Sequence, residues 1–393
     1  MTASESGATA LQGAPAGVVI YTHSLLSASM TFVKSHAEAL TRYRPLYVGA
    51  RRVDGIELPA DRTYVLNDGT AFGMIREAMF RQWDWAPTLV RKLRAQGPQI
   101  VHAHFGTSGP AGLALANSLG VPLVVTFHGH DATMHATEAT RSHRGRELLK
   151  KKPRLIAQAG AFIAVSEYIR TRLLAQGYPE ARVVLHRNGI DLDFFKPPAR
   201  TSSEPIILFV GRFVEKKGAR YLVEAASELS RAGVAYQLVM IGNGPNESEL
   251  KNAAARARIP CRFPGFLALD EVKSWLGKAC VVAVPSVTAS NGDTEGLPTV
   301  LLEAQAMAVP VVATRHSGIP EGVREGVTAE LVDEKDVATL AEKLRSFLQD
   351  PVKARAFGDA GRRFVCDNFD LRAQVNGLEE IYARLIAQRA SSL

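Results

Sequence analysis

The chain has 393 residues, of which 46% are hydrophobic and 22% charged, and this length is enough for two hydrophobic cores. Near-average use of glycine and proline excludes a fibrous protein and one that is disordered throughout. The formal net charge of +8 favours phosphate-bearing partners or an anionic membrane face, without choosing between them.

The N-terminal segment, residues 1–15, is predicted to be a disordered leader because it consists of small polar residues and scattered glycine. It lacks the basic and apolar regions of a signal peptide, and no run in the chain reaches the ~18 apolar residues that span a bilayer. The three cysteines, Cys261, Cys280 and Cys366, are odd in number and lack metal-ligand spacing, which favours a reducing compartment. We expect a cytoplasmic protein that is soluble or peripheral on the inner face of the cell membrane.

Short apolar runs rich in β-branched residues alternate with helical patterns along the first half of the chain. Such runs are typical of buried parallel strands, and the alternation predicts an α/β fold with a doubly wound parallel sheet. The strands are expected at residues 17–23, 45–48, 100–105, 123–128, 161–165 and 183–186. They predict a first Rossmann-like domain over residues 16–190, whose ligands would bind beyond the carboxyl ends of the strands.

A segment rich in turn residues and proline interrupts this alternation, and residues 191–205 are interpreted as a linker. A second series follows, with strands expected at residues 206–210, 236–241, 261–263, 281–284 and 309–313 and a helix at 219–231. It predicts a second Rossmann-like domain over residues 206–368. Apolar residues at helical spacing predict two or three helices between residues 336 and 388, and the helix within 369–393 is expected to pack back on the first domain.

The first strand of the second domain leads directly into the sequence Gly211-Arg-Phe-Val-Glu-Lys-Lys-Gly218. Arg212 and Lys217 would thus lie at the carboxyl end of a strand, where a guanidinium fork and a compact ammonium suit a diphosphate and stabilise charge on a leaving group. A solvated basic turn is the alternative. The turn at Gly242 lacks the third glycine of the dinucleotide fingerprint, so it indicates only close backbone approach and disfavours a nicotinamide enzyme.

Two carboxylates, Glu295 and Glu303, flank the tripeptide Gly296-Leu297-Pro298. The tripeptide predicts the start of a helix, because proline is tolerated in a first helical turn. Glu295 would then lie in a loop and Glu303 on the helix, and both can serve one ligand only if the loop folds back over the helix N-terminus. Free amides and the helix dipole there favour a phosphate, which leaves Glu303 for sugar hydroxyls. The alternative is an exposed loop acid and a solvated helix acid.

Histidines mark the ends of two predicted strands in the first domain. His128 can orient or polarise a sugar hydroxyl at such a strand end, and a structural hydrogen-bond donor is the alternative. His102 and His104 are two residues apart and would point to one face of their strand. No third ligand with suitable spacing follows, so no metal site is predicted.

A basic segment at residues 141–154 carries many cations against the single acid Glu147. It suits an anionic membrane or an acceptor diphosphate, and a solvated helix face is the alternative. The aromatic residues Phe80, Trp83 and Trp85 suit a lipid or a sugar ring, or belong to the core. The basic residues are not interleaved with an aromatic platform, so nucleic-acid binding is not predicted.

Taken together, these motifs resemble the retaining nucleotide-sugar glycosyltransferases of the GT-B fold, known as family four or group 1. The resemblance covers about residues 16 to 380 and rests on Gly211-Arg212 with Lys217, the Gly242 turn, the Glu295 to Glu303 element and Thr126-Phe-His-Gly-His-Asp131. Residues 291–298 and 316–321 are most similar to the branch that builds bacterial exopolysaccharides, including colanic-acid enzymes. The resemblance implies two Rossmann-like domains that face a cleft, with the donor held by the second and the acceptor by the first.

The resemblance also implies a role for each matching residue. Arg212 and Lys217 would hold the donor diphosphate, and Glu303 the ribose hydroxyls. Glu295 would contact the donor sugar near the reacting carbon, and His128 a sugar hydroxyl or the developing oxocarbenium charge. The predicted nucleotide-sugar-binding set is Gly211, Arg212, Lys217, Gly242, Glu295, Gly296, Leu297, Pro298 and Glu303, and the predicted catalytic set is His128, Glu295, Arg212 and Lys217.

The resemblance implies a UDP- or GDP-sugar donor, no other cofactor and no metal, and retention by front-face attack because no covalent nucleophile is evident. We interpret the chain as a transferase that moves a hexose onto a growing polysaccharide or a polyprenyl-diphosphate-linked saccharide. A transferase for a small soluble acceptor and a non-catalytic nucleotide-sugar-binding protein are the alternatives. The loop at residues 23–32 departs from the family, because it lacks a glycine pair and has Met30 where the exopolysaccharide branch has an acid.

Overall fold

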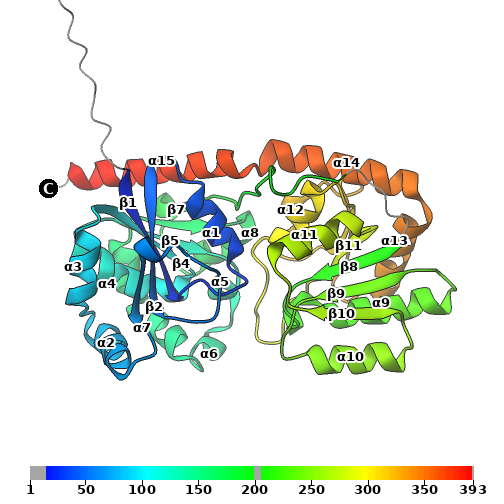
Figure 1. The fold of residues 1–393 in the computed structure, drawn as a ribbon, viewed down its shortest axis with the longest axis horizontal. Coiled ribbons are helices and arrows are strands. Elements are labelled where there is room, and N and C mark those ends of the chain that lie inside the picture. Colours follow the sequence, from blue (N-terminus) through cyan, green and yellow to red (C-terminus); the bar gives the residue numbers. More distant parts are fainter. Residues whose placement is uncertain (1–14, 199–204, 392–393) are drawn as a thin grey trace, which may run out of the picture.

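The computed structural model describes residues 15–198 and 205–391 of the chain. The leader predicted for residues 1–15 lies, apart from Pro15, outside the described residues, and so does most of the second half of the predicted linker. Two parallel sheets lie side by side, each covered by helices (Figure 1). The doubly wound parallel organisation predicted from the alternating pattern is confirmed for both sheets.

The first sheet has seven strands in the order β3-β2-β1-β4-β5-β6-β7. Neighbouring strands are parallel, so Val19 of β1 pairs with Leu46 of β2 on one side and with Val101 of β4 on the other. The strands are β1 (Ala16–Ser24), β2 (Tyr43–Arg51), β3 (Thr63–Asn67), β4 (Pro98–His104), β5 (Leu123–Phe127), β6 (Ala161–Ala164) and β7 (Val183–Leu185).

Helices cover both faces of this sheet, because alternate strand residues are apolar on each side. Val19 and Tyr21 face a core built with α2, α3, α4, α7 and α8, whereas Val18 and Ile20 face a core built with α1 and the C-terminal helix α15. The helices of the first half are α1 (Thr31–Glu38), α2 (Ala71–Trp83), α3 (Pro87–Arg94), α4 (Gly109–Leu119), α5 (His130–Thr133), α6 (Ala136–Ala139), α7 (His143–Gln158) and α8 (Glu167–Ala175).

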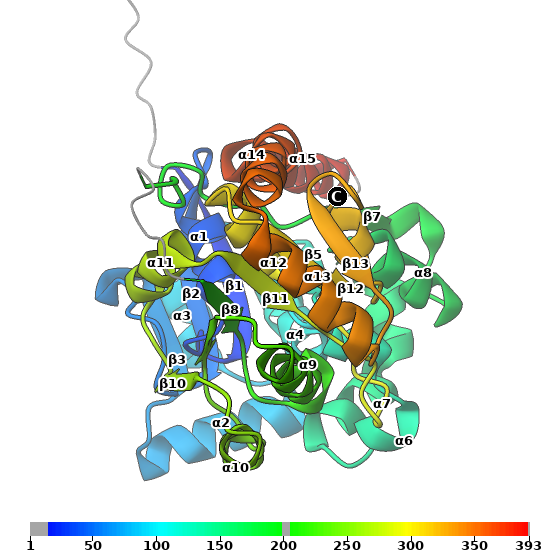
Figure 2. The same cartoon turned by 90° about the vertical axis from the view of Figure 1, so that its right-hand side faces the viewer.

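The second sheet has six strands in the order β10-β9-β8-β11-β12-β13, with α9 and α13 side by side on one face (Figure 2). Its strands are β8 (Ile206–Val210), β9 (Gln237–Ile241), β10 (Cys261–Gly265), β11 (Val281–Val284), β12 (Val311–Thr314) and β13 (Ala329–Val332). Its helices are α9 (Ala219–Arg231), α10 (Glu247–Arg256), α11 (Leu269–Lys278), α12 (Thr299–Ala306), α13 (Val337–Gln349) and α14 (Pro351–Asn368). Short 3-10 turns lie at η1 (Ala60–Arg62), η2 (Gly106–Ser108), η3 (Glu180–Arg182), η4 (Glu215–Lys217) and η5 (Ile319–Gly322).

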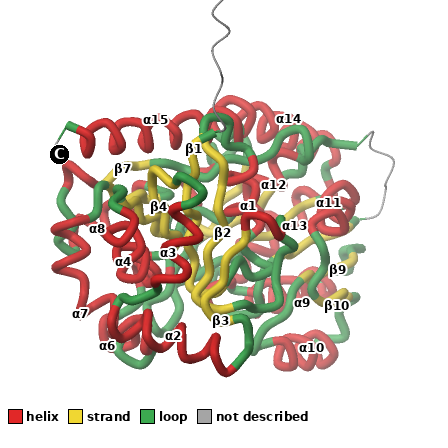
Figure 3. Tube along the Cα trace, turned by 60° about the vertical axis from the view of Figure 1, so that its left-hand side comes forward, coloured by secondary structure: helices red, strands yellow, loops and turns green. Residues whose placement is uncertain are grey.

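The chain returns to the first half through its last helix, α15 (Leu371–Ala390), which follows α14 along one side of the molecule (Figure 3). The side chain of Tyr382 is fully buried against the first sheet, and its hydroxyl is hydrogen-bonded to His102 Nδ1 at 2.5 Å. The carboxylate of Glu379 accepts hydrogen bonds from the backbone amides of Thr41 and Arg42, both at 2.7 Å. The helix is therefore part of the core of the first half, while the bounds predicted for the domains stay a prediction.

All strands predicted from the sequence are present, and the helix predicted at residues 219–231 matches α9. Two strands were missed, β3 and β13. Both lie at an edge of their sheet and are short, and each combines apolar residues with a polar or charged one. An edge strand has one neighbour only, so its sequence is under less pressure to be apolar throughout.

Candidate active site

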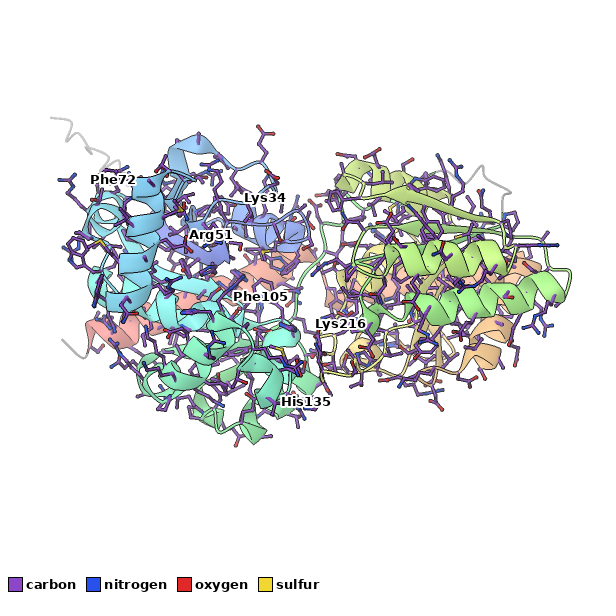
Figure 4. All side chains as sticks on the ribbon, turned by 90° about the horizontal axis from the view of Figure 1, so that it is seen from below. Lys34, Arg51, Phe72, Phe105, His135 and Lys216 are labelled. Carbon is purple, nitrogen blue, oxygen red and sulfur yellow. The ribbon has the colours of Figure 1, made fainter. Side chains whose placement is uncertain are left out.

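A pocket of about 930 Å³ lies between the two halves, at the carboxyl ends of strands from both sheets. We call it the interdomain pocket. The first half contributes α1 and the loops after β1 and β2, and the second half contributes the loops after β8, β9 and β10 and the start of α12. Figure 4 shows Lys34 of the first half and Lys216 of the second on opposite sides of the space between the halves. The lining includes Ser29, Lys34, Ile56, Gly211, Arg212, Lys217, Gly242, Phe266, Pro298, Thr299 and Glu303.

One wall of the interdomain pocket is formed by the loops after β8 and β9. These loops touch, because a Cβ atom on Gly242 would lie 2.0 Å from the carbonyl oxygen of Gly211, and Gly242 has a φ of 136°. Only glycine fits that position without a shift of the backbone. Arg212 is exposed in the same wall, and within the described residues its guanidinium has no ion-pair partner. A cation without a carboxylate partner is available to a ligand phosphate.

Lys217 links this wall to the acidic loop that precedes α12. Its Nζ atom lies 2.8 Å from Oε1 of Glu295, and both side chains are mostly buried. Burial alone would raise the pKa of Glu295, but the positive charges of Lys217 and Lys216 outweigh it and hold the pKa below its usual range. Glu295 is therefore a carboxylate at neutral pH, and it lies behind Lys217 rather than in the lining of the pocket.

The second acid, Glu303, lies on α12 and lines the interdomain pocket directly. The helix begins at Thr299 with Pro298 as its N-cap, so the helix start predicted at Gly296-Leu-Pro is confirmed. Burial raises the pKa of Glu303 to about 7, against a hydrogen bond with Thr299 and the charge of Lys217. Lys217 thus lowers the pKa of both acids, although only Glu303 lines the interdomain pocket.

A histidine fixes the backbone of the acidic loop from the far side. The amide of Glu295 donates to Nε2 of His316 at 3.2 Å, and Nδ1 of the same ring lies 2.6 Å from a carboxylate oxygen of Glu334. Because Nε2 accepts, the proton must be on Nδ1, where it is donated to Glu334. The tautomer of His316 therefore orients Glu295 through its main chain.

The two halves touch where this loop meets the loop after β5. A Cβ atom on Gly296 would lie 2.2 Å from the carbonyl oxygen of His128, and the amide of Thr294 donates to the Thr133 hydroxyl at 3.1 Å. Gly129 opposes Gly296 with a φ of 143°. The predicted binding residue Gly296 therefore serves close packing between the halves, and its neighbour Leu297 is buried in the core of the second half.

His128 is placed in a row of stacked rings rather than in the lining of the interdomain pocket. Its Nε2 atom is 3.1 Å from Nδ1 of His104, and the two rings stack with centroids 5.4 Å apart. The Nδ1 atom of His128 is buried without a hydrogen-bond partner in the described part of the chain. Burial lowers the pKa of His128 to about 3, so the ring is neutral at physiological pH. As predicted, His102 and His104 point to the same face of β4, with centroids 4.2 Å apart.

Sequence reasoning missed residues that hold the site in place. Lys216 binds Asp293 at 2.9 Å, and the same aspartate lies 3.2 Å from Nδ1 of His130 in the other half. Asp131 accepts hydrogen bonds at 3.0 Å from the amides of His128 and Gly129, which fixes the loop after β5. The signal available in the sequence was a match between two pairs of charges: Lys216 and Lys217 are adjacent, and Asp293 and Glu295 are two positions apart.

Glu321 makes a further bridge between the halves. Its carboxylate accepts hydrogen bonds from the amides of Glu167 and Tyr168 at the start of α8, at 2.8 and 3.0 Å. Arg187 donates to the same carboxylate at 3.0 Å. An acid at a helix N-terminus is favoured by the free amides and the helix dipole. The signal available in the sequence was that Glu321 ends the segment 316–321, which is similar to the exopolysaccharide branch of the family.

Residues 15–198 and 205–391 contain neither a membrane-spanning helix nor a cluster of metal ligands. No helix there combines the length and the apolar character needed to cross a membrane. No group of three or more histidine, cysteine, aspartate or glutamate residues there has the arrangement of a metal site.

Comparison with protein families places both halves of the chain. Residues 31–194 match the family described as Glycosyltransferase Family 4, and residues 191–364 match the family described as Glycosyl transferases group 1. The two matches meet at the segment that joins the sheets. Together they cover most of the described chain.

Three named proteins are similar in sequence. The chain is 35% identical to WcaL of Escherichia coli (strain K12), a protein named for colanic acid biosynthesis, over 63% of this chain and 61% of WcaL. It is 34% identical to the amylovoran biosynthesis glycosyltransferase AmsK of Erwinia amylovora, over 73% of this chain and 70% of AmsK. It is 31% identical to the GDP-mannose-dependent alpha-(1-6)-phosphatidylinositol monomannoside mannosyltransferase of Mycolicibacterium smegmatis, over 70% of this chain and 75% of that protein. The alignment with WcaL thus spans less than two thirds of that relative.

Solved structures share the fold across almost the whole chain. Sucrose-phosphate synthase from Thermosynechococcus elongatus has a TM-score of 0.75 at 22% identity, covering 95% of this chain and all of that one. HepE of Anabaena, solved in complex with UDP and glucose, has a TM-score of 0.74 at 19% identity, covering 94% of this chain and all of HepE. Sequence and structure agree that the chain belongs to the retaining family 4, group 1, of the nucleotide-sugar glycosyltransferases, with the GT-B fold.

Proposed function

We propose that this protein transfers a hexose, with retention and without a metal ion, from a UDP- or GDP-sugar to a saccharide acceptor in exopolysaccharide synthesis. The observation that carries the proposal is the convergence of Arg212, Lys217 and the N-terminus of α12 on one side of the interdomain pocket. Three sources of positive potential suit a diphosphate, and they also stabilise the charge that develops on it as the sugar leaves.

Each residue near the donor has one task in this proposal. Arg212 grips phosphate oxygens as a planar fork, and Lys217 supplies a compact charge between the diphosphate and Glu295. Glu303 accepts hydrogen bonds from the ribose hydroxyls. Glu295 orients the donor sugar near its reacting carbon, which is supported by its carboxylate state and by the fixed His316 behind it.

His128 contacts a hydroxyl of the donor sugar as a neutral ring. A pKa of about 3 supports this role over that of a cation, since an imidazolium would repel the oxocarbenium charge. Its backbone already touches Gly296, so a sugar bound beside Glu295 lies within reach of the loop after β5.

The acceptor is a saccharide on a polyprenyl diphosphate carrier, and the protein works in the cytoplasm at the inner face of the membrane. The names of WcaL and AmsK, in colanic acid and amylovoran biosynthesis, support an exopolysaccharide acceptor. The name of the mycobacterial relative supports GDP-mannose, and the HepE complex supports UDP. The odd number of cysteines, three, and their lack of metal-ligand spacing support a reducing compartment.

A thermal-shift screen tests the donor site. UDP, GDP, ADP and dTDP and their hexose conjugates are compared on the wild type, Lys217→Ala and the matched control Arg256→Ala, an exposed arginine of α10. Binding raises the melting temperature by mass action, so one base stabilises the wild type and the control but not Lys217→Ala. An equal response of all three proteins, or no response to any nucleotide, refutes the proposed donor site.

A transfer assay tests the chemistry. With the donor found in the screen and a lipid-linked saccharide acceptor, the product carries an α-linkage that is resolved by the one-bond coupling between its anomeric carbon and proton. Turnover continues in EDTA, because protein cations neutralise the diphosphate. An inverted product, or activity restored only by added divalent metal, contradicts the mechanism.

A further inference from the structure

A groove rich in arginine runs along the carboxyl edge of the first sheet, outside the interdomain pocket. It joins two adjoining pockets that share Glu77 and Arg81, one of about 480 Å³ between β2, β3 and α2 and one between α2 and α7. We call it the arginine groove, defined by Arg51, Arg52, Arg81 and Arg144, all of which are exposed. In Figure 4, Arg51 lies between α2, which carries Phe72, and the centre of the molecule.

The arginine groove holds more positive charge than its acids neutralise. The only buried carboxylate in its lining, among the described residues, is Glu77, and Arg51 binds it at 3.0 Å. Within the described residues, Arg52, Arg81 and Arg144 make no ion pair. Their fields meet at His23, whose pKa is lowered to about 4 by burial and then by Arg144, Arg51 and Arg81, against Glu77. Arginines from β2, α2 and α7 therefore face one place.

Large apolar side chains are also exposed on α2, and one of them, Met74, lines the groove. Phe72 is 78% exposed and Ile75 is 54% exposed, and their spacing of three puts them on one face of the helix. Met74 is exposed as well and lines the same pocket as Arg51 and Arg52. Three large apolar side chains exposed within one turn of a helix indicate a surface that is covered in the working protein.

The groove and the interdomain pocket are joined by one loop. His23 lies in the groove, and Ala28 and Ser29 of the loop after β1 line the interdomain pocket. A ligand whose anionic group lies among the arginines can therefore extend a polar chain along the carboxyl edge of the sheet toward the donor site.

We propose that the arginine groove is a lipid-diphosphate subsite, which holds the diphosphate of an isoprenoid-linked saccharide acceptor while its chain leaves the groove over Met74 and crosses α2 toward Ile75 and Phe72. The inference rests on the proposed function, which makes the acceptor a lipid-linked saccharide. A guanidinium group can bind two phosphate oxygens at once. The isoprenoid chain adds binding free energy because it covers exposed apolar surface. The sequence suggested an acceptor diphosphate at residues 141–154 and a lipid near Trp83, and the structure brings Arg144 and Arg81 of these two segments into one groove.

Farnesyl diphosphate, a short soluble isoprenoid diphosphate, is the probe, and inorganic pyrophosphate is its comparison. Binding is measured by titration calorimetry in the Lys217→Ala background, so that the probe does not occupy the donor site. Farnesyl diphosphate binds about tenfold more tightly than pyrophosphate, because only the former covers α2, and each factor of ten corresponds to ~1.4 kcal/mol.

Two double variants separate the charged and apolar contributions. Arg81→Ala with Arg144→Ala weakens both ligands about tenfold, as expected for two exposed charge pairs. Phe72→Ser with Ile75→Ser weakens farnesyl diphosphate to the level of pyrophosphate and leaves pyrophosphate unchanged. The matched controls, Arg256→Ala with Arg355→Ala and Val327→Ser with Val352→Ser, remove exposed side chains of the same kinds from the other half and leave both affinities as they were.

Unchanged binding of farnesyl diphosphate in the arginine variant overturns the proposal, and so does equal affinity of the two ligands in the Lys217→Ala background. Sedimentation with vesicles of phosphatidylglycerol and phosphatidylethanolamine distinguishes a second source of phosphate. Vesicle binding that both double variants abolish, without any binding of farnesyl diphosphate, assigns the surface to the bilayer and overturns the carrier subsite. The nucleotide thermal shift is repeated on the two groove double variants with Lys217 restored, where an intact shift together with the lost probe binding supports the proposal independently of the donor site.

Discussion

Replacing Lys217 by methionine isolates the ion pair with Glu295, which links the pocket wall formed by the loops after β8 and β9 to the acidic loop before α12. The partners are 2.8 Å apart, with side chains 20% and 8% exposed, so the substitution leaves a mostly buried carboxylate without its nearest cation. Breaking such a pair from one side costs about 3 kcal/mol, the low end of the usual range, because Lys216 remains nearby. The double variant Lys217→Met with Glu295→Gln removes the charge as well and recovers about 2 kcal/mol as coupling energy.

The loss depends on pH with a definite sign. In the wild type the folded-state pKa of Glu295 is lowered from 4.5, so the stabilisation is present above pH 4.5 and is lost as pH falls through the folded value. Without Lys217, burial raises the pKa of Glu295, so ionising this carboxylate lowers the free energy of unfolding as pH rises. The deficit of Lys217→Met is therefore largest at pH 7.5 and shrinks below pH 5.

Urea unfolding at pH 4.5 and pH 7.5, followed by Trp275 fluorescence in a Trp83→Phe, Trp85→Phe background, measures these free energies in the second half. Lys251→Met, which breaks an exposed pair with Glu247 on α10, is the matched control and costs less than about 0.5 kcal/mol. Effects of the two single substitutions that simply add, or a deficit equal at both pH values, would refute the reasoning.

Three further outcomes follow from buried groups elsewhere. Burial raises the pKa of Glu303 to about 7, so the protonated side chain contributes its full stability below pH 4.5 and this stability is lost as pH rises through 7. The free energy of unfolding is therefore expected to fall by ~3 kcal/mol between pH 5 and 8, and Glu303→Gln to flatten this pH dependence. Gly296→Ala puts a Cβ atom 2.2 Å from a carbonyl of the facing loop, so steady-state kinetics show transfer reduced at least tenfold, while Gly377→Ala, 3.5 Å from its nearest neighbour, keeps wild-type rates. Glu379→Ala removes the acceptor of two backbone amides and lowers the free energy of unfolding by about 3 kcal/mol, with α15 cut faster by protease; an unchanged cleavage rate contradicts the role of this anchor.

The fold was predictable wherever a strand is buried on both faces. Val18 to Tyr21 in β1 and Ile206 to Val210 in β8 are continuous apolar runs, and only a central parallel strand needs such a run. The edge strand β13 is short and contains Glu330, which forms ion pairs with two lysines. The charged residue interrupts the apolar run, so the segment is not recognisable as a strand from its sequence. The place of Tyr382 against His102 joins positions 280 residues apart, and no local pattern contains it.

The candidate site divides in the same way. Loops that follow strands or precede helices were predictable, because glycine, proline and charge at a strand end have local meanings, and these gave Gly211, Arg212, Lys217 and Glu303. Which lysine binds which acid was not predictable. Lys217 reaches Glu295 and Lys216 reaches Asp293 because η4 turns their side chains in different directions, which depends on three-dimensional packing.

The position of Glu295 is set by both halves of the protein at once. The chain crosses between the halves at residue 190 and again near residue 370, and there Ile190 exchanges two backbone hydrogen bonds with Phe369 and Leu371. The two crossings are thus tied to each other, and we call this place the hinge. Away from that hinge, Glu321 caps α8 and the loop before α12 packs on the loop after β5. Any opening about the hinge must break these contacts, which also hold the amide and the neighbours of Glu295. The observed geometry around Glu295 therefore depends on contacts between the halves. If Glu295 orients the donor sugar as proposed, Glu321→Ala, which removes the contacts with α8, is expected to lower transfer without changing nucleotide binding.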